Sequence, residues 1–281
     1  MRVGRIPYLN CAPVYGAVDR GIVTMDAELV SGVPSVLNRG VADGSIDVSV
    51  VSAVEYARDA GRYLLLPDLA ISCDGEVRSV MLFSTRPASE LSGAPVLVSR
   101  SSMTSVALLD LLFEHVWKAK PVFVPGDAEA DDLRTDHSSV SARLVIGDAA
   151  LMLRHREHPV AIAHGRDYPF VYDLGLEWKR WTALPFVFAV WVARREVNVR
   201  EALQVHGALM ESRHWGLANL AQISSEAAPT CQLPAAVVHE YLAGLDYGLG
   251  LEYLEGLSEF FRRLELAGKV PQGRLVFLPA A

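Results

Sequence analysis

The sequence has few cysteines, no long apolar run and no excess of positive charge, and each shortage excludes a class of protein. Its 3 cysteines, Cys11, Cys73 and Cys231, are far apart and never form a C-x-x-C pair. This pattern favours neither a disulfide framework nor a thiolate metal site. No stretch approaches the roughly 20 apolar residues of a membrane-spanning helix, and no apolar signal-peptide segment follows Met1. We therefore expect a cytosolic protein with no membrane partner.

The charge balance is mildly acidic. Lys and Arg number 26 and Asp and Glu number 33, which gives a formal net charge of -7 at pH 7. Such a surface offers no general field to attract phosphate backbones, so we expect no nucleic-acid partner. Hydrophobic residues make up 51% of the 281, which is enough to bury one large core or two smaller ones.

The signatures of common nucleotide-binding enzymes and hydrolases are also missing. The chain has no G-x-x-x-x-G-K-[ST] loop, no G-x-G-x-x-G after the first strand and no G-x-S-x-G elbow. His155 and His158 stand three residues apart and could share one face of a helix. Because no third ligand follows at a recognisable spacing, the sequence predicts no metal site.

Short apolar strands alternate with helical patterns along the first half of the chain. Strands are expected at 2–6, 27–30 and 47–51 with helices between them. This β-α-β-α-β order is typical of a parallel sheet. A second β-α-β pattern begins with a strand at 96–99, and from 198 onward the pattern is helical.

Two apolar strand candidates, near 77–86 and 185–193, separate these patterns. A chain needs two such crossings to leave one lobe, build a second and return. The sequence therefore predicts an α/β protein of two lobes, with a ligand cleft between them and a helical C-terminal segment. We expect residues 1–85 and 190–281 to form the first, discontinuous lobe, which holds both chain ends, and residues 86–189 to form the second.

Several hydroxyl side chains gather where the second pattern passes from its strand into an amphipathic helix expected over 102–117. They are Ser101, Ser102, Thr104 and Ser105. Free N–H groups at a helix N-terminus, together with nearby hydroxyls, bind a carboxylate or phosphate without a basic side chain. The alternative is ordinary capping, which needs only one hydroxyl. Both interpretations stay open on these residues alone.

Three further positions could face the cleft. Asn10 lies in the first strand-to-helix loop, where it could bind a ligand or form a local Asx turn before Pro13. Ser79 interrupts an apolar run, and could face the cleft or bond to a neighbouring backbone carbonyl. Asp148 lies at a strand-turn-helix junction, where capping of the helix competes with a place in the cleft.

Five short segments, in this order along nearly the whole chain, carry a resemblance to a known family. They are RVGRIPYLN at 2–10, CDG at 73–75, TSV at 104–106, GDAAL at 147–151 and WTALPFVFAVW at 181–191. Together they resemble the chorismate dehydratase family, which opens the futalosine route to menaquinone.

The resemblance implies a fold like that of type II periplasmic binding proteins, no cofactor, and removal of water from chorismate to give 3-[(1-carboxyvinyl)oxy]benzoate. The substrate is a dianion. Asn10 and Ser79 match positions with catalytic roles in the family. The residues expected to bind the substrate are Ser101, Ser102, Thr104, Ser105 and Asp148. No His or Glu falls within these motifs, so we hypothesise that the substrate's own enolpyruvyl carboxylate removes the ring C3 proton.

Two other functions are compatible with this fold. A cytosolic binding protein for an anionic solute would capture its ligand without chemistry. A sibling lyase of the same pathway would act on a futalosine-derived substrate. That sibling is characterised by a different first loop, which bears Ser, Pro, Asn and Asp, whereas Tyr8-Leu9-Asn10 resembles the dehydratase form.

Overall fold

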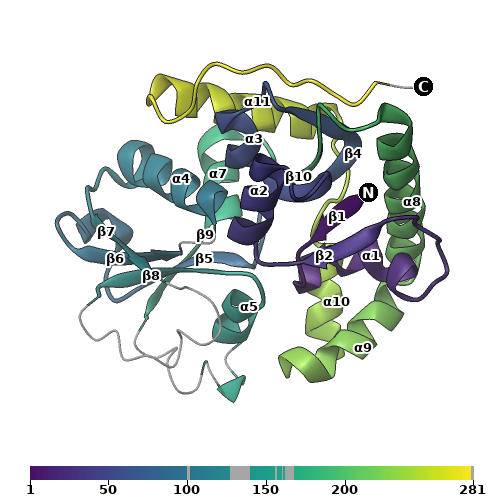
Figure 1. Cartoon of the computed structure of the whole chain (residues 1–281). Helices are drawn as coiled ribbons and strands as arrows, with labels where there is room; N and C mark the ends of the chain where they lie inside the picture. The colour runs from purple at the N-terminus through teal and green to yellow at the C-terminus, as the bar shows by residue number, and fades with distance from the viewer. Residues whose placement is uncertain (100–101, 127–139, 156, 160, 162–167, 280–281) are drawn as a thin grey trace.

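The chain folds around two five-stranded β-sheets, each flanked by helices (Figure 1). The computed structural model describes residues 1–99, 102–126, 140–155, 157–159, 161 and 168–279. The first sheet has the order β2 (Glu28–Ser31), β1 (Arg2–Arg5), β3 (Val48–Ser52), β10 (Phe186–Arg194) and β4 (Tyr63–Cys73). The second has the order β7 (Val122–Gly126), β6 (Pro95–Ser99), β8 (Ala142–Ile146), β5 (Val80–Ser84) and β9 (Phe170–Asp173).

The first sheet confirms the parallel arrangement predicted for the start of the chain. Strand β1 pairs in parallel with β2 and with β3. All five residues of β3 are buried, as expected for a strand covered on both faces. Strand β10 follows all strands of the second sheet in sequence, and it pairs antiparallel with both β3 and β4. The first sheet is therefore built from two distant parts of the chain.

Helices surround this sheet and, apart from short links, form the chain from Val199 to Leu266, as the sequence predicts, while the described residues after α11 are not helical. They are α1 (Ala12–Asp19), α2 (Pro34–Asp43), α3 (Ala53–Arg58), α8 (Val199–Ala218), α9 (Leu220–Cys231), α10 (Ala235–Ala243) and α11 (Leu251–Leu266). Helix α8 packs on α1 so closely that a Cβ atom at Gly216 would lie 2.0 Å from the carbonyl oxygen of Pro13. Helix α11 contacts β10, α3 and α4 (Met103–Leu112), and so touches both the first sheet with its helices and a helix that packs on the second sheet.

The second sheet has the same mixed character. Strand β6 is parallel to β7 and β8, and β5 is antiparallel to β8 and β9. Its helices are α4 (Met103–Leu112), α5 (Asp148–Arg154) and α7 (Leu174–Thr182). The single helix expected over 102–117 is wrong in its second part, because Phe113–Trp117 winds as a π-helical turn that ends at Lys118, whose φ of 55° is left-handed.

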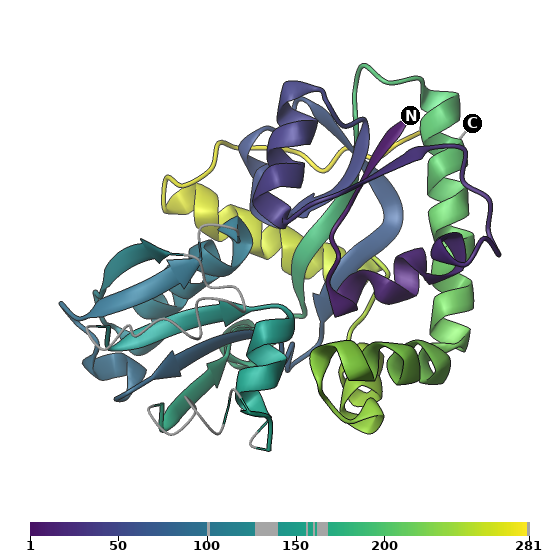
Figure 2. The same cartoon turned by 60° about the horizontal axis from the view of Figure 1, so that its bottom comes forward.

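The chain passes between the sheets at 74–79 and 183–185, two segments without regular structure (Figure 2). These crossings lie close to the expected positions. Strand β5, however, pairs only within the second sheet. The lobe limits at 85 and 190 stay a prediction. If each lobe is built around one sheet, β5 belongs to the second lobe. No helix in the described part of the chain is long and apolar enough to cross a membrane.

Candidate functional site

The first loop, which links β1 to α1, lies against the start of helix α5 on the other sheet. Gly147 makes the turn from β8 into α5 with a φ of 63°, a left-handed conformation that glycine adopts without strain. A Cβ atom at Gly147 would lie 3.4 Å from the ring of Tyr8. The next residue, Asp148, accepts a hydrogen bond from the backbone N–H of Leu9 through Oδ1 at 3.2 Å. The two lobes therefore meet through this loop.

A cavity of about 460 Å³ lies at this junction. It is lined by the first loop between Arg5 and Ala12, by the start of α5 including Asp148, and by the end of α9 including Cys231. This volume is in the range of small-molecule sites. Arg5 is the basic residue that lines this cavity, and its guanidinium forms an ion pair with Asp19. The sequence analysis did not single out Arg5.

Burial at this junction raises the pKa of Asp148 and of Cys11. Desolvation raises the pKa of Asp148 to about 6, while its hydrogen bond from Leu9 N–H acts in the opposite direction. Desolvation also raises the pKa of the Cys11 thiol to about 12, so this thiol stays protonated and is a poor nucleophile at neutral pH. Asp148 therefore titrates closer to neutral pH than an ordinary aspartate.

Asn10 follows Leu9 in the same loop. Its Oδ1 atom is buried and has no hydrogen-bond partner among the described residues. Buried polar atoms are nearly always paired, so an unpaired acceptor beside a cavity is a group that a ligand donor would satisfy. The structure does not support the local Asx turn, since Oδ1 accepts no hydrogen bond from the described backbone.

Ser79 lies at the end of the first crossing, next to the same junction. Its carbonyl oxygen accepts a hydrogen bond from the N–H of Gly147 at 2.8 Å. Ser79 is only 2% exposed, and its hydroxyl donates to the carbonyl oxygen of Val77 at 3.4 Å, a long and weak contact. Ser79 is thus linked through Gly147 to Asp148, which in turn binds Leu9 of the first loop.

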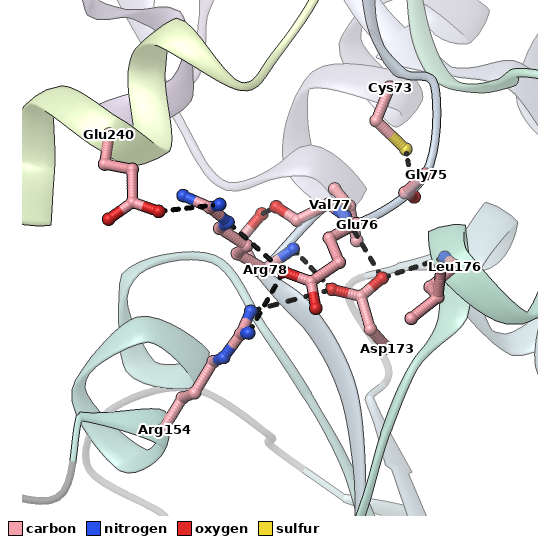
Figure 3. Close-up of polar contacts among 10 residues, drawn as sticks. Cys73, Gly75, Glu76, Val77, Arg78, Arg154, Asp173, Leu176 and Glu240 are labelled. Carbon is pink, nitrogen blue, oxygen red and sulfur yellow. Dashed lines mark hydrogen bonds and ion pairs between the residues drawn. The ribbon is translucent and has the colours of Figure 1, made fainter.

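The segment before Ser79 is held by a buried carboxylate, as Figure 3 shows. Asp173 accepts hydrogen bonds from the backbone N–H groups of Val77 at 3.0 Å, Arg78 at 2.7 Å and Leu176 at 3.1 Å. Burial raises the pKa of Asp173, although all three hydrogen bonds oppose this effect. Arg78 adopts a left-handed φ of 64° here. The conformation that presents Ser79 therefore depends on Asp173.

The hydroxyl cluster lies apart from the cavity, at the contact between helices α4 and α3. Ser102 caps α4 by accepting from Ser105 N–H at 3.4 Å and also donates to Ser105 Oγ at 2.6 Å. Thr104 Oγ1 accepts from the N–H of Val54 at 3.1 Å. All three described hydroxyls are thus engaged within the protein, and their role in substrate binding stays a prediction. Ser101 lies outside the described residues.

Two further buried residues that the sequence did not single out lie near the predicted site residues. Asn38 on α2 donates to Ser52 Oγ at 3.3 Å and contacts the Met103 sulfur at 3.8 Å, beside the start of α4. Tyr241 on α10 lies beside Ser79. Their neighbours are distant in sequence, so no local pattern could have identified them.

A larger cavity of about 980 Å³ lies beside α5 and α7, lined by Glu76, Arg154 and Arg180 among others. None of the predicted site residues lines it, whereas Asp148 and the two residues that flank Asn10, Leu9 and Cys11, line the smaller cavity, so we assign the candidate site to the smaller one. No group of three or more His, Cys, Asp or Glu side chains in the described part of the chain is placed to hold a metal ion.

Comparison with known proteins identifies the fold. A protein from Archaeoglobus fulgidus has a TM-score of 0.75 and 21% identity, over 96% of this chain and 98% of that chain. The alkanesulfonate-binding protein of Xanthomonas axonopodis pv. citri has a TM-score of 0.68 and 14% identity, over 98% of this chain and 96% of that chain. A Candida albicans protein described as having the generic periplasmic binding protein fold has a TM-score of 0.65 and 9% identity, over 98% of this chain and 92% of that chain. The chain therefore has the two-lobed periplasmic-binding-protein fold that its sequence resemblance implies.

Sequence comparison identifies the family. The chorismate dehydratase of Thermus thermophilus is 33% identical over 265 residues, which are 92% of this chain and 93% of that protein. Residues 1–266 match the family described as menaquinone biosynthesis. The match extends from β1 through α11, and so includes both sheets and the candidate site. The chain belongs to the menaquinone biosynthesis family.

Proposed function

We propose that this protein is a chorismate dehydratase, which removes water from chorismate to form 3-[(1-carboxyvinyl)oxy]benzoate. The observation that carries this proposal is the relative of that name, which is 33% identical over nearly the full length of both chains. Membership of the menaquinone biosynthesis family supports the same reaction. The cytoplasmic location expected from the sequence stays a prediction.

The junction of the two lobes has the size and polarity that such a substrate requires. Chorismate is a small dianion, and the cavity of about 460 Å³ combines an apolar lining with Arg5 and the first-loop backbone. The start of helix α4 lies apart from this cavity, so the donors assigned here are Arg5 and the first-loop backbone. These local donors have to act against a formal net charge of -7 on the whole chain. We therefore assign substrate affinity to these groups rather than to a basic surface.

The proposed elimination breaks the C–H bond at ring carbon C3 and the C–O bond at C4, and the ring becomes aromatic. The electron pair left at C3 is delocalised through the diene onto the ring carboxylate, so hydrogen-bond donors at that carboxylate stabilise the transition state more than the ground state. The enolpyruvyl carboxylate of the substrate takes the C3 proton. The C4 hydroxyl then leaves as water with the proton that this carboxylate took from C3, so the carboxylate is regenerated and atoms and charge balance.

In this scheme the protein orients groups that react within one molecule. The Asn10 amide and the Ser79 hydroxyl orient the enolpyruvyl carboxylate and the leaving hydroxyl. The buried, unpaired Oδ1 of Asn10 supports this role, since it is an acceptor that a substrate hydroxyl would satisfy. The 2.8 Å hydrogen bond from Gly147 N–H to the Ser79 carbonyl supports a position for Ser79 at the same junction.

The test is to incubate purified protein with chorismate and to follow the mass of the product. Formation of a species lighter by one water supports the proposal. Unchanged chorismate that nevertheless binds would overturn it in favour of a solute-binding protein. Unchanged chorismate without binding, together with turnover of a futalosine-derived substrate, would favour the sibling lyase. A protein heated until it unfolds serves as the control for spontaneous breakdown of chorismate.

A further inference from the structure

Helix α10 packs against the crossing that carries Ser79. Glu240 on this helix forms an ion pair with Arg78, with 2.8 Å between Oε1 and Nη2 (Figure 3). The next residue of the helix, Tyr241, lies beside the next residue of the crossing, Ser79. Two consecutive residues of α10 thus lie against two consecutive residues of the crossing, which places the helix beside the Ser79 hydroxyl.

The phenol hydroxyl of Tyr241 is unusual for a buried polar group. Tyr241 is 1% exposed, and its hydroxyl forms no hydrogen bond of good geometry with any described residue. Its polar neighbour is the Ser79 hydroxyl, which is near enough to act against the rise in pKa that burial causes in Tyr241. A buried phenol without a proper partner costs free energy, so its place beside a candidate catalytic serine calls for an explanation.

The chemistry of the two hydroxyls decides which of them donates. Burial raises the pKa of Tyr241 far above its usual value, so the phenol stays protonated and can donate. A serine hydroxyl has one proton and two acceptor lone pairs. If the phenol donates to Ser79 Oγ, the serine proton is left for another acceptor. Its present acceptor, the Val77 carbonyl at 3.4 Å, is held only weakly and is easily exchanged for a substrate oxygen.

We infer that Tyr241 is a positioning residue, which donates a hydrogen bond to Ser79 and so directs the Ser79 proton toward the substrate. This inference rests on the proposed function, because it assigns Ser79 to the reacting substrate. The donated bond also makes the Ser79 hydroxyl a better donor, since hydrogen bonds in a chain polarise one another. Tyr241 thus acts on the leaving hydroxyl or the carboxylate only through Ser79.

The variant Tyr241→Phe removes the hydroxyl and keeps the ring that fills the core. We expect kcat for chorismate to fall about fivefold, the effect of one lost neutral hydrogen bond, with KM changed less than about twofold. In a Ser79→Ala background the same substitution is expected to have no further effect, because the group through which it acts is gone. An equal loss in both backgrounds, or no loss in the wild-type background, would overturn the inference.

Tyr247→Phe is the matched control. Tyr247 is the other tyrosine whose buried hydroxyl lacks a hydrogen bond among the described residues, and its neighbour is Tyr241. We expect this variant to keep kcat within about twofold of wild type. A loss as large as that of Tyr241→Phe would show that any buried hydroxyl here supports activity only through folding.

A second measurement tests the contact without any turnover. An isotope label on the tyrosine ring carbon that bears the hydroxyl reports hydrogen bonding in the magnetic resonance spectrum. We expect the Tyr241 signal to shift in Ser79→Ala while the Tyr247 signal stays in place. Without that shift the inference fails, whatever the kinetics. If the Tyr241 signal shifts in Ser79→Ala but the wild-type protein does not turn over chorismate, the proposed function is overturned instead.

Discussion

The carboxylate of Asp148 accepts a hydrogen bond from the backbone N–H of Leu9 at 3.2 Å, although the two residues are 139 positions apart in the chain. This bond joins the first loop of one sheet to the first residue of helix α5 on the other. Because Asp148 also lines the cavity, the same side chain holds the two lobes together and forms part of the candidate site. Its protonation should therefore affect stability.

The first prediction concerns the pH dependence of that stability. The pKa of Asp148 is raised from 3.8 to about 6 in the folded protein, so the folded state binds more protons than the unfolded state between these values. Stability contributed by this group is therefore present below pH 4 and is lost as the pH rises through 6. We expect the free energy of unfolding of wild type, relative to Asp148→Asn, to fall by about 2 kcal/mol between pH 4 and pH 7.

Denaturant unfolding of both proteins at several pH values measures this difference. The Asn variant keeps an acceptor for Leu9 N–H and does not titrate, so all other ionisable groups cancel in the comparison. Two parallel curves would contradict the raised pKa.

The second prediction concerns the contact between α3 and α4. Thr104 is buried and accepts from Val54 N–H at the start of α3. Thr104→Val has the same shape but leaves that N–H unpaired, so we expect a loss of about 1 to 3 kcal/mol in the free energy of unfolding. Thr104→Ser keeps the hydroxyl and should lose no more than about 1 kcal/mol, the contribution of one methyl group. A valine variant as stable as wild type would argue against this bond.

The third prediction concerns the crossing before Ser79. Asp173→Ala removes the acceptor for three backbone N–H groups, and we expect it to lower the free energy of unfolding by about 3 kcal/mol. Turnover should fall as well in any variant that still folds, because Ser79 loses its support. Glu76→Gln is the control, since Glu76 belongs to the same network through half-exposed ion pairs worth less than about 1 kcal/mol. Equal effects of the two substitutions would be inconsistent with a special role of Asp173.

The fourth prediction concerns the end of helix α7. Ala183 closes this helix with a left-handed φ of 63°, a conformation that costs any residue with a Cβ atom. Ala183→Gly should therefore raise the free energy of unfolding by about 0.5 to 1 kcal/mol. Thermal unfolding measures the gain, and Ala193→Gly, within buried strand β10, should instead destabilise the protein. A loss of stability in Ala183→Gly would contradict this argument.

Much of the fold could be predicted from the sequence because its signal is local. The strand near Val48 is a largely apolar run of the length of a buried strand, and the helix near Ser102 begins at a capping serine, although it stays α-helical only to Leu112. Strand β9 and helix α7, over 170–182, were not predicted. Strand β9 is a short edge strand with mostly part-exposed residues, and α7 begins directly after it at the buried cap Asp173, so neither has a long pattern of its own.

The site was predictable only in part, for a related reason. Asn10, Ser79 and Asp148 stand in local motifs, and the structure places them at one junction. The importance of Asp173, Tyr241 and Asn38 comes from contacts between residues far apart in the chain, such as Val77 with Asp173. Local sequence contains no information on such pairs. The local pattern that includes Thr104 and Ser105 predicted a site for an anion. It did not reveal that both hydroxyls form hydrogen bonds within the protein.

The central claim is that the junction containing Asn10 and Ser79 removes water from chorismate. The most direct test is the rate at which purified wild type, Asn10→Ala and Ser79→Ala form a product lighter by one water. We predict turnover by wild type and a loss of at least about tenfold in each variant, which corresponds to about 1.4 kcal/mol of transition-state stabilisation. Variants within about threefold of wild type, a difference below about 0.7 kcal/mol, would contradict the claim.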